Sequence, residues 1–293
     1  MGDVMFIDAL LDSLIDSIKL IPFLFLTYLL MEYLEHKASE KTEEIVLKSG
    51  DWGPLWGSLL GVVPQCGFSA AASNLYAGRV ITLGTLISIY LSTSDEMLPI
   101  MISSQAPITL ILKILGLKVL IGMVFGFLID LGVRIVKGPV RIKYRAEHLI
   151  ENICDHDHCK CDDGHFVKSA CMHTLQVFAF IFIISLALNL IIGIVGEDTL
   201  ASFMAGKDII GVFVSALIGL IPNCASSVVI TELYMEGILS FGAMMSGLLV
   251  GAGVGLLVLF RVNKTVKNSL MVTGILYILG VISGLILGIL NIV

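Results

Sequence analysis

Eight long apolar stretches run through this chain of 293 residues and constrain its fold more than any other feature. Each is close to or longer than the ~20 residues that a helix needs to cross a bilayer. Only 14% of the residues are charged, whereas a soluble domain carries about 25%. We therefore expect an all-α polytopic membrane protein with roughly eight to ten membrane segments. The apolar stretches cover 13–34, 53–77, 80–102, 108–136, 175–195, 209–235, 238–260 and 270–293.

An internal repeat with an offset of 158 residues divides the chain. The offset relates Pro64 to Pro222 and Cys66 to Cys224. One offset that holds over so long a range indicates duplication of a whole structural unit. We expect an N-terminal membrane repeat at 1–137, a polar linker at 138–165 and a C-terminal membrane repeat at 166–293. Further related pairs are Ser69 and Ser227, Tyr76 and Tyr234, Gly84 and Gly242, Gly126 and Gly284.

Each repeat has a proline in the middle of an apolar stretch, at Pro64 and at Pro222. Proline ends a helix, and about ten residues on either side rise only ~15 Å, half a bilayer. The stretch is therefore either a broken spanning helix or a re-entrant hairpin. Lys and Arg collect in cytoplasmic loops, and hairpins with a cytosolic linker and outside termini satisfy this rule better. Hairpins give each repeat an odd number of crossings, so the repeats are inverted, as in secondary transporters.

The two hairpin tips are the candidate substrate site. A cysteine follows each proline by two residues, at or just before the start of the second arm, where the helix dipole favours the thiolate. Sulfur ligands suit trivalent arsenic or antimony, Cu(I), Zn(II) or Cd(II). The alternative to a substrate site is that duplication copied this turn and that the motif persists for structural reasons alone. The candidate substrate-binding residues are Pro64, Gln65, Cys66, Ser69, Pro222, Asn223, Cys224 and Ser227.

Three acidic residues are candidates for ion coupling. Asp95 and Glu96 lie within the third apolar stretch, and Glu232 lies in the second arm of the second hairpin. Charges at membrane depth are expensive and mark ion or proton sites. The alternative is that the helix ends near Ser92, which would place Asp95 and Glu96 at the outer interface.

The linker contains a short tract rich in Cys, His and Asp, "CDHDHCKCDDGH". Such tracts bind metal ions, although this spacing matches no fixed zinc-finger pattern. A flexible acidic linker is the alternative. We expect a metal ion here and no other cofactor; its candidate ligands are Cys154, His156, His158, Cys159, Cys161 and His165.

The sequence has no phosphate-binding loop and no soluble segment large enough for an ATPase. We expect no enzymatic activity and no nucleic-acid partner. The sequence leaves open whether the chain forms a homo-oligomer. Transport would use an ion gradient, a partner ATPase or the gradient of the solute. One rival is a Mn(II) or Zn(II) transporter that uses the oxygens of Asp95, Glu96 and residues 92–94. The others are a thiol oxidoreductase that pairs Cys66 with Cys224, and a metal sensor.

The repeated "PQCG" and "PNCA" tips, "NLYAGRVITLGTLI", "LSTSDEMLPI" and "FGAMMSGLLVGAGVGLLVLFRVNK" resemble the ten-segment heavy-metal exporters, often labelled arsenic efflux proteins. That family resembles the organoarsenical permeases. The resemblance covers nearly the whole chain. It implies a multi-pass protein of a prokaryotic inner membrane that exports a metal or metalloid, trivalent arsenic first among them. Cys66 and Cys224 match the tip cysteines of the family.

Overall fold

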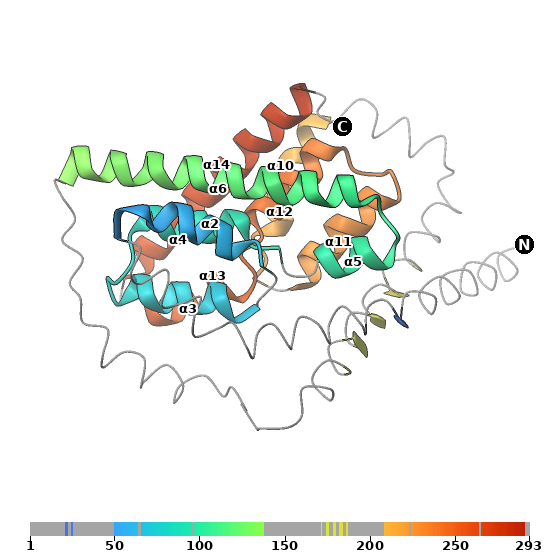
Figure 1. Cartoon of the computed structure of the whole chain (residues 1–293), viewed down its shortest axis with the longest axis horizontal. Coiled ribbons are helices and arrows are strands. Elements are labelled where there is room, and N and C mark those ends of the chain that lie inside the picture. Colours follow the sequence, from blue (N-terminus) through green and yellow to red (C-terminus); the bar gives the residue numbers. More distant parts are fainter. Residues whose placement is uncertain are drawn as a thin grey trace, which may run out of the picture.

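The computed structural model describes residues 50–63, 66–94, 97–137, 208–222, 224–263 and 265–290, with isolated residues between 21 and 25 and between 171 and 186. Within these ranges the regular structure is helical (Figure 1). The first part contains η1 (Gly50–Trp52), α2 (Gly53–Gly61), α3 (Cys66–Ala77), α4 (Leu83–Ser92), α5 (Met97–Ser103) and α6 (Ile108–Lys137). The second contains α10 (Asp208–Gly219), α11 (Cys224–Met235), α12 (Phe241–Val250), α13 (Val254–Val262) and α14 (Val266–Ile289).

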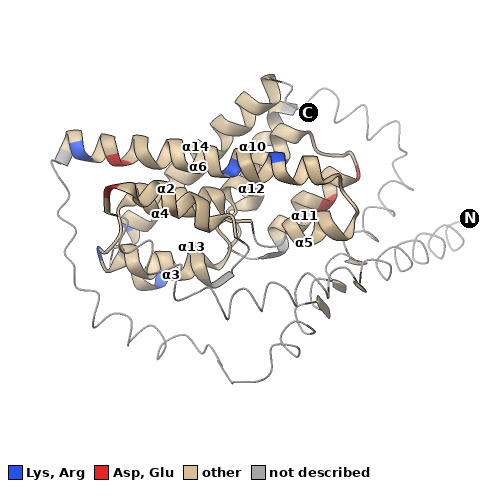
Figure 2. Ribbon diagram, in the orientation of Figure 1, with Lys and Arg blue, Asp and Glu red and all other residues tan. Residues whose placement is uncertain are grey.

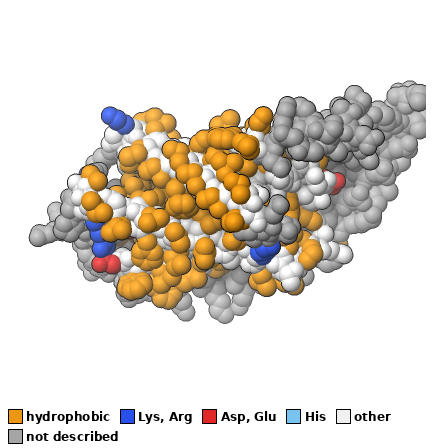
Figure 3. All heavy atoms as spheres, turned by 90° about the horizontal axis from the view of Figure 1, so that it is seen from above, with side chains coloured by type: hydrophobic (Ala, Val, Ile, Leu, Met, Phe, Trp, Pro, Cys, Tyr) orange, Lys and Arg blue, Asp and Glu red, His pale blue; other side chains and the backbone are white. Residues whose placement is uncertain are grey.

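Three stretches of the described residues are long and apolar enough to cross a membrane: Ile108–Val136, Phe241–Val262 and Val266–Ile289. The 30 residues of α6 span about 45 Å, more than the ~30 Å of bilayer hydrocarbon. Figure 3 shows hydrophobic side chains over most of the described surface seen from above. Exposed apolar surface on this scale belongs in lipid; its side chains include Leu112, Leu120, Leu128, Ile209, Leu217, Leu270, Ile278 and Ile286.

Helices α4 and α6 pack antiparallel. Thr82, the N-cap of α4, donates to Asp130 near the end of α6 at 2.6 Å. At the other end of α4, Thr93 accepts a hydrogen bond from Lys118, three turns earlier in α6. The axes approach closely because glycine lies at the crossing: a methyl group on Gly84 would overlap the carbonyl oxygen of Gly126.

The same packing recurs 158 residues later, where α12 lies on α14. A methyl group on Gly242 would lie 2.6 Å from the carbonyl oxygen of Gly284. Ser240 caps α12 by accepting from the amide of Ala243, as Thr82 caps α4. The repeat seen in the sequence therefore corresponds to repeated helix packing.

Helix α2 runs parallel to α4, although one helix separates them in the chain. Gly53 lies against Thr85 at one end, and Gly61 lies against Ser92 at the other. The chain must therefore return along α3 before α4 begins. In Figure 1, α2 and α3 lie one above the other, each with one end near the middle of the molecule. Helices α2 and α3 therefore run in opposite directions and are not one continuous helix.

The second proline segment is built alike. Helix α10 is parallel to α12, since Gly211 lies against Ala243 and Gly219 against Gly247. Helix α11 returns the chain. Each returning helix packs on the other part of the chain: α3 packs on α13, and α11 packs on α5.

The apolar stretches 80–102 and 238–260 were expected to be single helices, and the structure corrects this. Helix α4 ends at Ser92 and α5 begins at Met97, while α12 ends at Val250 and α13 begins at Val254. We call these interruptions the first and second break. Thr93 has an extended ψ of 130°. Gly253 has φ 53°, a left-handed conformation that favours glycine.

Candidate functional site

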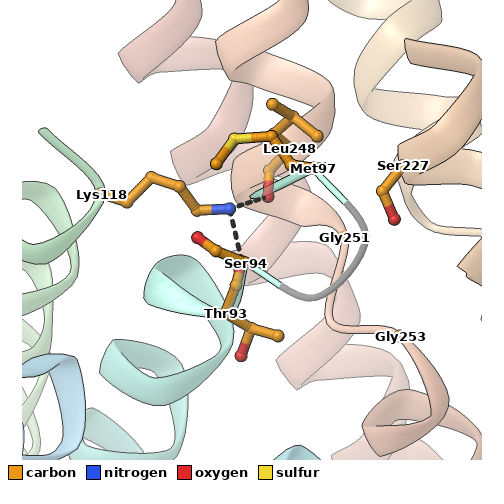
Figure 4. A pocket seen from close by; sticks show the side chains of 8 residues that line it. All are labelled: Thr93, Ser94, Met97, Lys118, Ser227, Leu248, Gly251 and Gly253. Atoms are coloured by element: carbon orange, nitrogen blue, oxygen red, sulfur yellow. Dashed lines mark hydrogen bonds between the residues drawn. The ribbon is translucent and has the colours of Figure 1, made fainter. Parts of the chain in front are cut away.

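A small crevice lies where the two breaks meet (Figure 4). Its volume is about 10 Å³, room for about one water molecule. Backbone that is neither helix nor lipid-facing is found at membrane depth where it lines a cavity. The crevice therefore accounts for the non-helical backbone of the two breaks. Its lining residues are Thr93, Ser94, Met97, Lys118, Ser227, Leu248, Gly251 and Gly253.

Lys118 is the charged residue of this lining. Its side chain is 1% exposed. Figure 4 shows it extending from α6 to the point where the backbones of α4 and α12 come together. Its Nζ donates to the carbonyl oxygen of Thr93 at the first break and to that of Leu248, at 2.8 Å, in the last turn of α12. The ammonium thus joins the two parts of the chain at the crevice.

A hydroxyl network holds α3 in place next to the crevice. Ser73 and Tyr90, both fully buried, lie 2.7 Å apart between their oxygens. Both hydroxyls lie within hydrogen-bonding distance of the carbonyl oxygen of Gly255, in the first turn of α13. Gly255 also packs so tightly on Ser69 that a methyl group there would lie 2.8 Å from it. Helix α3 is therefore fixed to the far side of the second break.

The structure describes only part of each predicted tip. Helices α3 and α11 begin at Cys66 and Cys224, which confirms their predicted position at helix N-termini. Ser226 donates across the second tip to the carbonyl oxygen of Ile221 at 3.3 Å. Pro222 is exposed. Pro64, Gln65 and Asn223, and the side chains of both cysteines, lie outside the described residues.

Of the other two tip candidates, one reaches the crevice. Ser227, in the first turn of α11, lines it from the side opposite Lys118 (Figure 4). Ser69, its counterpart in α3, is fully buried against Gly255. The described part of the site is therefore asymmetric: the second tip contributes a side chain to the crevice, and the first is fixed by packing.

The candidate acids fall into two cases. Asp95 and Glu96 lie outside the described residues, but Ser94 and Met97 on either side are 2% and 1% exposed. The helix does end at Ser92, yet its end is buried in the protein. Glu232 is 9% exposed, and its Oε1 has no hydrogen-bond partner among the described residues. A buried carboxylate oxygen without a partner is costly and keeps Glu232 a candidate for ion coupling.

The linker ligands Cys154, His156, His158, Cys159, Cys161 and His165 lie outside the described residues. Cys171, beyond the linker, is exposed and not in a disulfide. The described part of the chain contains no group of three or more His, Cys, Asp or Glu side chains that could hold a metal ion.

Sequence reasoning missed Lys118 and the two breaks. The signal for Lys118 was available, since a lysine in the middle of the apolar stretch 108–136 is expensive unless it has a polar partner. Around the second break, Gly247 and Gly255 serve close packing, while Gly251 and Gly253 line the crevice.

Comparison with protein-family models matches residues 5–197 to the family described as "Putative, 10TM heavy-metal exporter". The match covers about two thirds of the chain, including Cys66, Lys118 and the linker. The chain belongs to this family. Its membrane-spanning helices agree with a multi-pass exporter. No curated protein and no solved structure matches the chain.

Proposed function

We propose that the chain is a secondary transporter that exports a thiophilic metal or metalloid, trivalent arsenic species first among them. The observation that carries the proposal is the pair of hairpin tips, each with a cysteine as the first residue of the returning helix. Thiolates at helix N-termini are suited to soft solutes. The crevice at the crossing of the breaks lies beside the second tip, because Ser227 lines it.

In this proposal the two repeats are inverted and the two hairpins are re-entrant. The exchange of partners supports it: α3 packs on α13, and the equivalent α11 packs on α5. Such an exchange is expected of two copies related by a pseudo-twofold axis. Discontinuous helices that meet at the repeat interface are the architecture of alternating-access transporters.

Charge supports a cytosolic linker and outside termini. Tyr76 and Asn268 are 3.2 Å apart between the phenol oxygen and Nδ2, so the turn after α3 lies beside the start of α14. Figure 2 shows most of the coloured Lys and Arg at the end of the molecule where α6 ends. Positive charge at the linker end fits the positive-inside rule; residues of this kind are Arg79, Arg134, Arg261 and Lys267.

In the proposed transport cycle, the tip residues, the acidic residues and the linker have separate roles. Cys66 and Cys224 would bind the solute, with Gln65, Asn223, Ser69 and Ser227 supplying oxygens around it. Glu232, with Asp95 and Glu96, would couple export to protons. The linker cysteines and histidines would capture the metal on the cytosolic side. The hairpins would act as the two gates.

Uptake into everted vesicles tests the proposal. Vesicles with wild type, Cys66→Ser or Cys224→Ser would be supplied with arsenite, methylarsenite, Zn(II) and Mn(II). Cys171→Ser is the matched control, because Cys171 is exposed and lies outside the tips. We expect each tip variant to lose at least about tenfold in arsenic uptake rate, corresponding to about 1.4 kcal/mol, and the control to keep it. Wild-type rates in both tip variants would exclude the two-sulfur site.

The same vesicles separate the rivals. A divalent-cation transporter would move Zn(II) or Mn(II) with both tip variants unimpaired. The buried hydroxyls of Ser92, Thr93 and Ser94 at the first break are the observation that favours it. A sensor would move no solute, and deletion of 152–165 would abolish its metal binding altogether.

A further inference from the structure

The two carbonyl oxygens that bind Lys118 are free of helical partners because both lie at the end of a helix. Thr93 is the C-cap of α4, and Leu248 lies in the last turn of α12, which ends at Val250. The last four carbonyls of a helix have no amide of that helix to accept from, and the helix end carries partial negative charge. Two such ends point at one place here, one from each part of the chain.

Unwound backbone carbonyls and the C-terminal ends of half-helices coordinate Na⁺ in transporters with discontinuous helices, and the two carbonyl oxygens here are donors of that kind. Thr93, Ser94 and Ser227 line the same crevice; the hydroxyls of Thr93 and Ser94 donate to the carbonyl oxygens of Ile89 and Ser92. In the described structure the cation at the carbonyl pair is the ammonium of Lys118, held by both oxygens and 1% exposed.

We propose that the carbonyl oxygens of Thr93 and Leu248 form a monovalent-cation site and that Lys118 is its built-in occupant. The tethered ammonium takes the place of a free ion. The protein as it exists therefore needs no free Na⁺ or K⁺ at this site, and a variant without the ammonium accepts a small cation from solution. Only the consequence for transport rests on the proposed function; the cation site rests on the geometry.

The site is single. The residue 158 positions after Lys118 is Leu276, which is fully buried and apolar. The two carbonyls are not related by the repeat either, since Thr93 corresponds to Gly251 and Leu248 to Tyr90. The ammonium is thus an asymmetric addition to a repeated framework, and one substitution removes it.

Thermal unfolding of the purified full-length protein in detergent tests the proposal. Wild type, Lys118→Ala, Lys118→Met and Lys113→Ala are compared in choline chloride and in NaCl, KCl and NH₄Cl of equal ionic strength. Lys113 is the control because it is an exposed lysine on the same helix. Choline is too large for the site, so it reports the effect of ionic strength alone.

We expect Lys118→Ala to unfold at a lower temperature than wild type in choline and to regain about 5 °C in at least one small cation at a hundredfold excess over its apparent Kd. The unfolding temperatures of wild type and of Lys113→Ala should be the same in all four salts. Lys118→Met, which fills the space with an apolar chain, should show less recovery than Lys118→Ala.

The proposal is wrong if neither Lys118 variant distinguishes Na⁺, K⁺ or NH₄⁺ from choline. It is equally wrong if both variants fail to fold in every salt, because a free cation then does not replace the ammonium. The measurement uses no arsenic and no transport, so failure of the exporter assignment leaves it unaffected. Where export is measurable, wild-type rates should be equal in choline and NaCl, and Lys118→Ala should require the small cation.

Discussion

At the scale of single residues, the carboxylate of Asp130 on α6 binds the N-terminal end of α4 and so joins the two helices. Its two oxygens accept from the Gly84 amide at 2.8 Å and from the Thr82 hydroxyl at 2.6 Å, and it is 9% exposed. We expect Asp130→Ala to lower the free energy of unfolding by about 2 kcal/mol, because it leaves the Gly84 amide buried without a partner. Denaturant unfolding in detergent measures the loss.

Arg134→Ala is the control for this prediction, one turn further along α6. Arg134 pairs with Asp51, but their side chains are 43% and 75% exposed, and exposed ion pairs contribute under about 1 kcal/mol. If Arg134→Ala lowered the free energy of unfolding as much as Asp130→Ala does, the charges at the end of α6, and not the buried Asp130 hydrogen bonds, would stabilise the contact between α4 and α6.

Glu232 belongs to the same scale, and its prediction concerns function. Glu232→Gln removes a buried carboxylate whose Oε1 has no described partner, so we expect unchanged or higher stability. If Glu232 carries the coupling proton, the variant should also lose the dependence of export on an imposed pH gradient. Uptake rates in vesicles with and without the gradient measure this. An unchanged ratio would remove Glu232 from the coupling residues.

The sequence was informative about single residues where chemistry and repetition coincide. Cys66 and Cys224 were found because each follows a repeated proline, and both begin helices. Lys118 has no counterpart 158 residues later, so the repeat does not mark it. Its partners are backbone carbonyls at breaks, which no side-chain motif marks.

At the scale of elements, glycine spacing predicts which helices touch. Gly84→Ala would force a methyl group onto the Gly126 carbonyl, and Gly242→Ala would place one 2.6 Å from the Gly284 carbonyl. Backbone cannot move aside as a flexible side chain does. We expect each substitution to lower the free energy of unfolding by about 3 kcal/mol, the upper end of the usual effect of overpacking. The measurement is the loss of folded protein on heating.

Gly116→Ala and Gly274→Ala are the matched controls. They are also 158 residues apart on the long helices α6 and α14, and no described atom lies within 4 Å of a methyl group at either. We expect no loss, or a gain of up to about 1 kcal/mol from higher helix propensity. A comparable loss at all four glycines would mean that helix flexibility, and not close approach, requires them.

Helix breaks are harder to predict than helix contacts. In a bilayer, Ser, Thr and Gly are compatible with a helix, so the stretches 80–102 and 238–260 look continuous by hydropathy. Where the first break begins, the hydroxyls of Ser92 and Thr93 donate to the carbonyl of Ile89, one turn back. The second needs Gly253 in a left-handed conformation. Both breaks depend on partners distant in sequence, since Lys118 binds the Thr93 carbonyl and Tyr90 binds the Gly255 carbonyl, and the local sequence does not specify these partners.

At the scale of the whole molecule, the described helices combine an apolar outside with a polar crossing point. Leu120 and Leu128 on α6 are about half exposed, while Lys118 between the helices is not. In water this arrangement would be inverted. The lipid solvent therefore explains both the apolar surface in Figure 3 and the need for each inner polar group to have a partner.

Inversion of the two repeats can be tested with the turn that closes each hairpin. The turn after α3 contains Arg79 at φ 61°, and 158 residues later Gly237 has φ 72°, so the two turns have the same local structure. In a chain with its native cysteines replaced by serine, Arg79→Cys and Glu236→Cys would place one thiol at each turn. Both positions are exposed or partly exposed at helix ends, where labelling reagents have access.

If the repeats are inverted, a membrane-impermeant maleimide should label position 79 only in everted vesicles and position 236 only in intact cells. Labelling of both from the same side would mean parallel repeats. The two proline tips would then enter from one face, and a shared two-cysteine site at the midplane would be excluded.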